Sequence, residues 1–349
     1  MIRVGIAGMG FMGWIHWLAY RATPGIRVTA LCTLERHRLE GDWREIRGNF
    51  GPPGESVDVS SLGRYERIEG MLEDPSIDLI DVCLPPHLHA EVTIRALNAG
   101  KHVFCEKPMA LTPEDCERMI EAARKANRQL FVGHVLPFFP EYAHARQLIA
   151  GGRYGRLRGG SFKRIISDPT WLKEFYNPAH TGGPLLDLHV HDAHWIRLLF
   201  GMPASVAGRG RMRGEVVEYA HASFGFSDPS LVVSAESGVV QPQGRSFTQG
   251  FEIHLENATL QYEFAVFGGK PRLILPLTIC DDGGQVLQPS LGDGDPVRAF
   301  EAEIAEIARS LESGRPSPLL SGELARDAVR ICQKETESVA GGRPVPFAS

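Results

Sequence analysis

The fold is decided by the first thirteen residues of the chain, MIRVGIAGMGFMG (residues 1–13). A short apolar run leads directly into a glycine-rich turn, and a second apolar segment follows it. The glycines have the spacing G-x-G-x-x-G, in the strand, turn and helix context that makes this spacing informative. Gly8 permits the tight turn, Gly10 lets a pyrophosphate approach the backbone, and Gly13 lets the helix pack closely on the strand. Because the first N–H groups of such a helix face phosphates, the stretch predicts a dinucleotide-binding turn rather than a purely structural one.

Composition sets the class of protein. A chain of 349 residues, with 43% hydrophobic and 23% charged residues, suggests an ordinary globular protein of about two domains. Its net charge of −5 implies no basic face, so nucleic acid is not expected as a partner. No apolar run approaches the ~18–20 residues that span a bilayer, and no charged-then-apolar leader is expected. The six cysteines form no C-x-x-C pair and are expected to be free thiols in a reducing, cytoplasmic setting.

The first third of the chain alternates strand and helix patterns. Strands are expected over residues 3–7, 27–32, 79–84, 102–105 and 129–132, and helices over 11–20, 87–99 and 113–127. Thr112, Pro113 and Glu114 supply the N-cap, first-turn proline and first-turn acid of the last helix. This alternation indicates an open parallel sheet with helices on both faces. We therefore expect a dinucleotide-binding Rossmann domain over residues 1–133.

After about residue 135 the pattern changes. Strands are expected over 159–166, 220–226, 231–236, 251–255 and 259–264, with helices over 141–150, 184–200 and 297–313. Runs joined by Gly, Asp, Asn and Pro turns usually pair antiparallel. The expected fold class is therefore α/β: an N-terminal Rossmann fold, then an α+β domain over residues 134–349 with a large, mostly antiparallel open sheet. This second domain is expected to bind substrate, and its C-terminal helix to pack back on the first domain.

Two short motifs stand at the ends of expected strands. Ligands of open α/β sheets bind outside the carboxyl ends of the strands, so the loop with Leu84, Pro85 and His87 is expected to border a nicotinamide ring. The alternative is that two prolines simply end the strand. Glu106 and Lys107 follow the next expected strand. A lone lysine beside a glutamate is usually a solvated pair, but this position in the sheet favours a functional role.

The third motif is the His- and Asp-rich segment 182–194. If it is helical, Asp187 and His191 are one turn apart on one face, which suits a carboxylate and an imidazole that address the same substrate hydroxyl. His194 falls near that face, whereas His189 points roughly the other way.

The same segment also resembles a set of metal ligands. On a helix, His189 and His191 lie about 200° apart and cannot share an ion, whereas on a strand they would share a face with Asp187. A metal-dependent lyase or hydrolase that uses the Asp187–His194 cluster is therefore the alternative, although we expect no bound metal. A third interpretation is that some of these histidines only form hydrogen bonds in the core.

Taken in order, these motifs resemble the Gfo/Idh/MocA family of NAD(P)-dependent oxidoreductases, which includes inositol and sugar dehydrogenases. The resemblance rests on the glycine turn, on AGKHVFCEKP (residues 99–108), and on the glycine pair and Asp-x-x-x-His of residues 182–191. It implies a Rossmann domain joined to a domain whose open sheet often forms the oligomer interface, and hence a homodimer or homotetramer. By likeness, Lys107, Asp187 and His191 take the places of the family's catalytic trio.

The cofactor is NADP or NAD. The second expected strand leads into Thr33, where NAD-preferring relatives place an Asp that repels a 2′-phosphate. Thr33 removes that repulsion, and Arg36 and Arg38 supply positive charge, so the sequence favours NADP unless both arginines face solvent. The other expected cofactor contacts are Gly8, Gly10, Phe11, Met12, Gly13, Leu84, Pro85, His87, Glu106 and Lys107.

The expected reaction is reversible oxidation of a secondary alcohol of a sugar, cyclic polyol or sugar derivative. His191 suits the role of base, with Lys107 stabilising the alkoxide, but Lys107 is the base if burial depresses its pKa. The expected substrate contacts are Lys107, His134, Trp171, Asp187 and His191. Trp171 either stacks on a sugar ring or packs in the core. A cofactor-binding sensor of the same fold, without turnover, is a further alternative.

Overall fold

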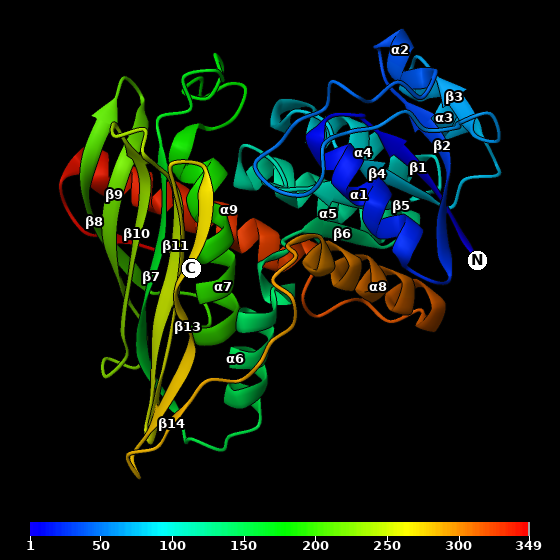
Figure 1. The fold of residues 1–349 in the computed structure, drawn as a ribbon. Coiled ribbons are helices and arrows are strands. Elements are labelled where there is room, and N and C mark those ends of the chain that lie inside the picture. Colours follow the sequence, from blue (N-terminus) through cyan, green and yellow to red (C-terminus); the bar gives the residue numbers. More distant parts are fainter. Residues whose placement is uncertain (348–349) are drawn as a thin grey trace. The chain divides into compact units, whose positions relative to one another are not determined.

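The computed structural model describes residues 1–347, which form two compact units (Figure 1). The first unit consists of Met1–Phe139 and Asp293–Arg326, and the second of Pro140–Gly292 and the chain from Asp327 onward. Within residues 1–347, no helix is both long and apolar enough to span a membrane.

The first unit contains a six-stranded sheet in the order β3-β2-β1-β4-β5-β6. Its strands are β1 (Ile2–Ala7), β2 (Ile26–Cys32), β3 (Gly63–Tyr65), β4 (Leu79–Val82), β5 (His102–Glu106) and β6 (Leu130–Gly133). Every neighbouring pair is parallel, as predicted. The strand order reverses between β1 and β4, and such a switch point is where doubly wound sheets bind their ligands.

Helices cover both faces of this sheet, because right-handed crossovers toward opposite edges leave their helices on opposite faces. The helices are α1 (Phe11–Ala22), α2 (Arg36–Leu39), α3 (Ile68–Glu73), α4 (His89–Asn98), α5 (Pro113–Ala126) and α8 (Val297–Ser313), with 3-10 turns at Pro86–Leu88 and Leu136–Phe138. α1 packs on α8, and α4 packs on α5. The predicted start of α5 is confirmed, since the Asp115 N–H donates to the Thr112 hydroxyl over 3.1 Å.

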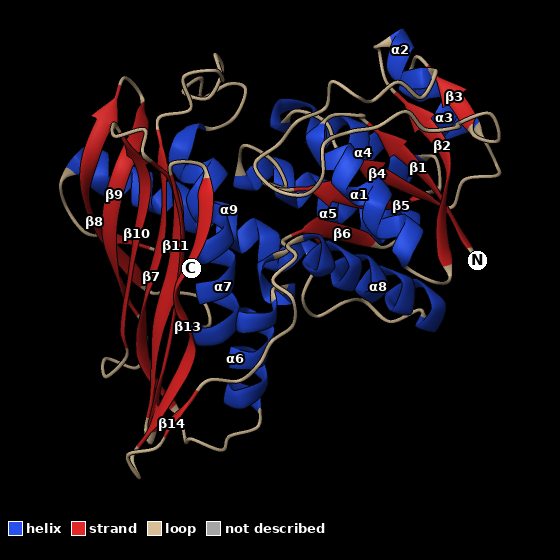
Figure 2. Ribbon diagram, viewed as in Figure 1, coloured by secondary structure: helices blue, strands red, loops and turns tan. Residues whose placement is uncertain are grey.

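The second unit contains a nine-stranded sheet in the order β14-β13-β12-β11-β7-β10-β9-β8-β15. Its strands are β7 (Leu157–Ser167), β8 (Ser205–Arg213), β9 (Val216–Gly225), β10 (Val232–Val240), β11 (Arg245–Leu255), β12 (Ala258–Phe267), β13 (Lys270–Asp281), β14 (Val286–Leu287) and β15 (Val345–Pro346). Only β7 and β10 pair parallel among its described strands, so the prediction of a mostly antiparallel sheet is confirmed. The helices α6 (Pro140–Ala150), α7 (Val190–Phe200) and α9 (Gly322–Gly341) lie on one side of it in Figure 2.

Several elements differ from the sequence-based expectation. The helix expected over 184–200 consists of a π-helical turn, Leu185–His189, followed by α7. The sequence analysis did not predict β8, β13 or α9. β8 alternates glycine with arginine near the sheet edge, and β13 contains Pro271 and Pro276, so neither strand shows the usual alternation of apolar residues.

Candidate cofactor and active-site residues

The glycine turn after β1 has the geometry that its spacing predicts. Gly8 has a φ of +101°, and a Cβ there would lie 2.3 Å from the carbonyl oxygen of Cys83. A Cβ on Gly13 would lie 2.2 Å from the carbonyl oxygen of Gly8. By contrast, a Cβ on Gly10 would meet nothing within 4 Å, and Gly10 caps α1 without a side-chain hydrogen bond. This open space beside the N-terminus of α1 fits a pyrophosphate.

The ends of the central strands lie at one edge of the sheet. Ala7 at the end of β1 pairs with Val82 at the end of β4, and Val82 pairs with Cys105 of β5. The register therefore brings together the loops that follow these strands. Many of the residues expected to contact cofactor or substrate lie at or just beyond the carboxyl ends of β1, β4, β5 and β6. They are Gly8, Gly10, Phe11, Met12, Gly13, Leu84, Pro85, His87, Glu106, Lys107 and His134.

A buried histidine that the sequence analysis missed joins two of these loops. The Nδ1 atom of His89 lies 2.8 Å from the carbonyl oxygen of Pro108, and its Nε2 atom lies 2.7 Å from that of Leu84. Burial lowers the pKa of His89. The imidazole thus holds the loop after β4 to the loop after β5.

At the end of β2, a glutamate occupies the space beside Thr33. The Thr33 hydroxyl donates to Oε2 of Glu35 over 2.5 Å, and this bond, ahead of the Arg38 charge, lowers the pKa of Glu35. Arg38 donates from Nη1 to the Met9 carbonyl over 3.0 Å, and its Nη2 lies 2.7 Å from Oε1 of Glu45. Arg38 therefore lies against the glycine turn, with its charge matched by carboxylates.

Arg36 and His37 of this loop also lie beside glutamates. Nε of Arg36 lies 3.3 Å from Oε1 of Glu40 at an exposed position. His37 lies 2.9 Å from Glu45, which also pairs with Arg38. The positive charge expected here from the sequence is balanced by glutamates.

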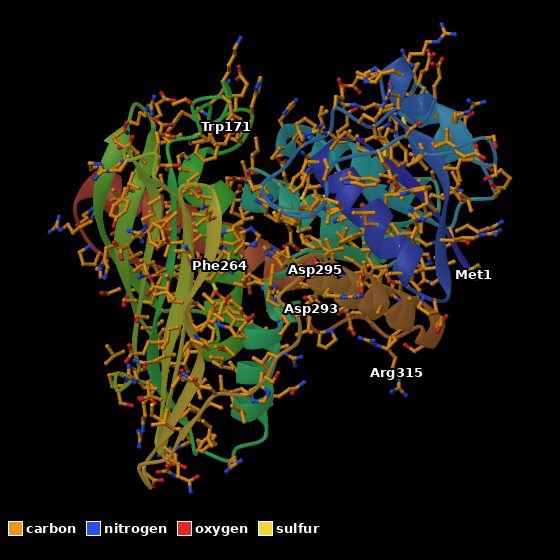
Figure 3. All side chains as sticks on the ribbon, in the orientation of Figure 1. Met1, Trp171, Phe264, Asp293, Asp295 and Arg315 are labelled. Carbon is orange, nitrogen blue, oxygen red and sulfur yellow. The ribbon has the colours of Figure 1, made fainter. Side chains whose placement is uncertain are left out.

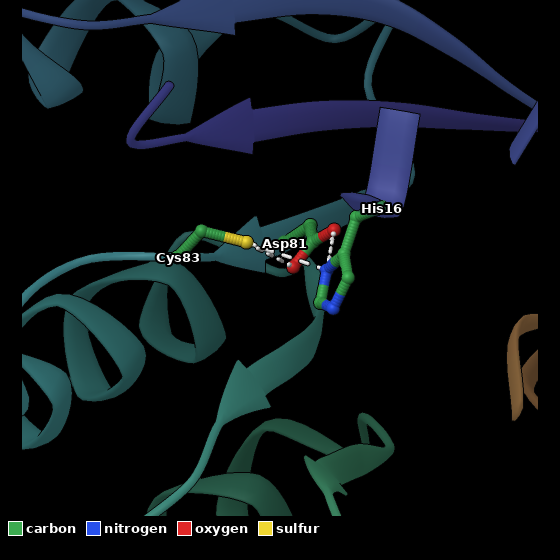
Figure 4. Close-up of side chains that lie close together, drawn as sticks. All are labelled: His16, Asp81 and Cys83. Atoms are coloured by element: carbon green, nitrogen blue, oxygen red, sulfur yellow. Dashed lines mark hydrogen bonds and ion pairs between the residues drawn. The ribbon is translucent and has the colours of Figure 1, made fainter. Parts of the chain in front are cut away.

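Lys107 is held through its neighbour Glu106. Glu106 is buried, and its Oε2 atom accepts the Lys107 N–H over 3.1 Å. Its Oε1 atom lies 3.1 Å from Nε2 of His16, a buried residue of α1 that the sequence analysis did not single out. Nδ1 of His16 in turn lies 2.9 Å from Oδ2 of Asp81, and Figure 4 shows this pair with Cys83. A polar residue inside an apolar run was the available signal for both His16 and Asp81.

In the second unit, Asp187 lies on the π-helical turn and His191 on the first turn of α7. Both side chains are partly buried, and four residues of helix place them about one turn apart. π-Helical turns occur frequently at functional sites. His189 is buried, with Nε2 2.9 Å from Oε2 of Glu335 and its ring parallel to Phe224.

The helical backbone also bears on the metal-ligand alternative. Because residues 185–200 are helical, Asp187, His189 and His191 do not share a strand face. Within residues 1–347, the Asp187–His194 segment brings no three potential ligand atoms together, and the one group that meets this condition lies in the first unit.

A buried ion pair fixes α7 on the sheet. Arg164 of β7 donates from Nε to Oδ2 of Asp192 over 2.8 Å and from Nη2 to Oδ1 over 3.2 Å. Its Nη1 donates to Oε1 of Gln249 on β11 over 2.9 Å. Two parallel charge-assisted bonds restrict both position and orientation, so the residue next to His191 is anchored in the core.

The two remaining expected substrate contacts have opposite surroundings. The Trp171 side chain is 64% exposed on the loop after β7 (Figure 3), so the alternative of a core residue is not supported. His134 is buried, and its N–H donates to the Val132 carbonyl over 2.7 Å.

Two family models match the chain. The model described as an oxidoreductase family with an NAD-binding Rossmann fold matches residues 2–134, and the C-terminal domain of the same family matches residues 142–261. The chain belongs to the Gfo/Idh/MocA family of oxidoreductases. The resemblance inferred from its motifs is confirmed, and the protein is an oxidoreductase.

Individual relatives agree with this assignment. 1,5-Anhydro-D-fructose reductase from Ensifer adhaerens is 31% identical over 265 residues, which cover 73% of this chain and 75% of that protein. Myo-inositol 2-dehydrogenase from Thermotoga maritima is 27% identical, and the match covers 99% of this chain and 98% of that protein. Among solved structures, the chain is similar to the crystal structure of an oxidoreductase from Agrobacterium radiobacter in complex with NAD⁺, L-tartaric acid and magnesium. The TM-score is 0.81 at 16% identity, and the match covers 99% of this chain and 98% of that chain. The comparisons give no support to a lyase.

Substitution of Gly10 tests whether the open space beside the N-terminus of α1 binds the cofactor pyrophosphate. A Cβ at Gly10 meets nothing within 4 Å. For Gly10→Val we therefore expect an unchanged melting temperature and a Kd for NADH raised at least about tenfold, because the side chain fills the space for the pyrophosphate. NADH fluorescence titration measures the Kd. Gly244→Val is the control, since a Cβ there also meets nothing within 4 Å. Wild-type NADH affinity in Gly10→Val would place the dinucleotide elsewhere.

Proposed function

We propose that the protein reversibly oxidises a secondary alcohol of a sugar or cyclic polyol. The observation that carries this proposal is that the open glycine turn and Lys107 follow strands whose ends align at one edge of a parallel sheet. The names of two relatives, an anhydrofructose reductase and an inositol dehydrogenase, support the substrate class. When bound, the nicotinamide supplies the hydride acceptor or donor.

The residues proposed to act on the substrate hydroxyl are Lys107, Asp187 and His191. As the carbonyl forms, the hydroxyl proton needs an acceptor, and an imidazole titrates close to physiological pH. We assign this role to His191, with Asp187 one turn away to orient it and balance its charge. The Lys107 ammonium donates to the substrate oxygen and stabilises negative charge on it. His134 and the exposed Trp171 are proposed to contact the sugar or polyol.

Replacement of the proposed catalytic groups is expected to reduce turnover without loss of cofactor binding. In Lys107→Ala and His191→Ala, kcat falls by about 10²–10⁴-fold, the usual contribution of a general acid or base, and NADH affinity changes little. The assays use 1,5-anhydro-D-fructose with NADH and myo-inositol with NAD⁺ as first substrates. Lys125→Ala, a surface lysine paired with Glu121, is the control. Near-normal turnover in Lys107→Ala would refute the mechanism.

For the cofactor, we propose NAD rather than NADP. The missing aspartate after β2 favours NADP on sequence grounds, but the Glu35 carboxylate beside Thr33 restores a negative charge there. An acidic residue at this position accepts hydrogen bonds from the ribose hydroxyls and repels a 2′-phosphate. Arg36 and Arg38 are paired with glutamates, so their charge is already balanced.

The ratio of two dissociation constants tests this preference. NADH is expected to bind more tightly than NADPH, and Glu35→Gln is expected to reduce that ratio by about tenfold, because like charges at a protein surface repel by one to a few kcal/mol. Glu55→Gln makes the same charge change farther along this loop, where Glu55 pairs with Arg21 of α1, and it is expected to leave the ratio unchanged. Tighter binding of NADPH by the wild type would contradict the assignment.

We further propose a homodimer or homotetramer formed through the nine-stranded sheet. In the described part of the second unit, the helices lie on one side of this sheet, which leaves the other side for a second copy. The hairpin of β12 and β13 also carries Phe267, Leu273 and Ile274, each about half exposed. Apolar side chains exposed near one end of a sheet favour an interface.

Sedimentation velocity tests this assembly. The wild type is expected to sediment as a dimer or tetramer, and Leu273→Asp with Ile274→Asp to shift it toward the monomer, because buried unpaired charges are costly. Leu34→Asp, at an exposed leucine of the first unit, serves as the control. A monomeric wild type would rule out the assembly.

A further inference from the structure

Four ionisable side chains are buried together beneath the sheet edge that carries Lys107. They are His16 of α1, Asp81 of β4, Glu106 of β5 and Glu303 of α8, and none is more than 5% exposed. Ionisable groups are seldom this buried unless they are paired or neutral. The question is therefore which of them are charged and what their charges hold in place.

His16 lies between two carboxylates. Its Nδ1 atom is 2.9 Å from Asp81 Oδ2, and its Nε2 atom is 3.1 Å from Glu106 Oε1. The ring stacks on Phe104, with centroids 5.0 Å apart and planes 14° apart. Burial alone would lower the pKa of His16, but the Asp81 carboxylate outweighs it and raises the pKa well above its usual value. The Asp81 carboxylate thus favours the protonated ring of His16, and the contacts with both carboxylates and Phe104 orient that ring.

Burial favours the neutral forms of two neighbouring groups. Burial, followed by the charge of Glu106, raises the pKa of Glu303 well above its usual value. Within residues 1–347, neither carboxyl oxygen of Glu303 has a hydrogen-bond partner. Burial and the Asp81 charge also raise the pKa of the Cys83 thiol. The imidazole of His16 thus faces two carboxylates, those of Asp81 and Glu106.

His16, Asp81 and Cys83 also carry atoms that bind metals, and these atoms lie within 4.8 Å of one another. Nδ1 of His16 is, however, already hydrogen-bonded to Asp81 at 2.9 Å. Zinc bonds of about 2.0–2.3 Å in a tetrahedral arrangement hold ligand atoms about 3.3 Å or more apart. The distances are those of a hydrogen-bonded charge network.

The network reaches Lys107 through the backbone. Glu106 is the last residue of β5, and its Oε2 atom accepts the Lys107 N–H over 3.1 Å. In β6, Gly133 pairs with Glu106, and a Cβ there would lie 2.9 Å from Glu106 Oε1. One oxygen of the carboxylate therefore lies within ion-pair distance of His16, and the other accepts the Lys107 N–H.

The same helix connects this network to the glycine turn. α1 begins at Phe11, directly after Gly10, and carries His16 one and a half turns later. We propose that His16 is a positioning residue: through Glu106 it holds Lys107 in register with the glycine turn. The importance of Lys107 for turnover rests on the proposed function, whereas the coupling itself does not.

Amide hydrogen exchange of the cofactor-free protein tests the coupling directly. In His16→Gln, exchange at the Lys107 amide, resolved by fragmentation mass spectrometry, is expected to rise at least about tenfold, because its acceptor is no longer held. In the same variant kcat is expected to fall about 10–100-fold, since small misplacements of a catalytic group are costly, with little change in NADH affinity. His102→Gln is the control, because His102 lies at the other end of β5 and accepts the Gln129 N–H over 3.0 Å. It should change neither quantity.

A second variant removes the same contact from the other side. Glu106→Gln retains an oxygen for the Lys107 amide but loses the attraction to His16, so exchange at Lys107 should also rise. The double variant should lose no more activity than the more severe single variant, because both act through one contact. If His16→Gln does not fold, the exchange rate of the Lys107 amide in Glu106→Gln tests the proposal.

Wild-type exchange at Lys107 in folded His16→Gln, or independent losses in the double variant, would overturn the proposal. The readouts also separate this proposal from the catalytic one. Normal turnover in Lys107→Ala would refute the proposed function, whereas the exchange rate would still decide the role of His16.

Discussion

The first unit depends on the close backbone approach at the glycine turn. Gly8 passes so near the Cys83 carbonyl, and Gly13 so near Gly8, that no Cβ fits at either position. This contact fixes β4 beside β1 and sets the point at which α1 leaves the sheet. The direction of α1 then determines where its fifth and sixth residues, Ile15 and His16, enter the core. The same constraint therefore shapes the space for the cofactor pyrophosphate and places His16 beside the carboxyl ends of β4 and β5.

Both units use buried charge to fix the elements that carry the candidate catalytic residues. In the first unit, His16 lies between carboxylates and controls Glu106, next to Lys107. In the second, Arg164 holds Asp192, next to His191, and Glu335 holds His189 within the π-helical turn. Buried pairs of this kind contribute little net stability, but the loss of one partner is costly. Their value here lies in the single geometry that they impose on neighbouring residues.

Much of this organisation could be read from the sequence, because strand ends and glycine spacing are local signals. The glycine turn, the parallel sheet, and the helical face shared by Asp187 and His191 were predicted from short-range patterns. His16, His89 and Arg164 were missed because their partners lie far away in the chain, as with Arg164 and Asp192 or His16 and Asp81. His16 interrupts an apolar run, and that was the only local sign that it has a buried polar partner. For a related reason, the sequence does not reveal that Glu35 and Glu45 lie close enough to pair with Arg38.

The measurement that tests this account most directly is a fluorescence titration of the wild-type protein with NADH. A parallel sheet with an open, uncapped helix N-terminus at its switch point predicts saturable binding at micromolar concentration, with one site per chain. Energy transfer from the protein's tryptophans to the bound nicotinamide would report it. Absence of saturable binding by NADH would contradict the account, because the glycine turn would then be structural and Lys107 would have no cofactor to work beside.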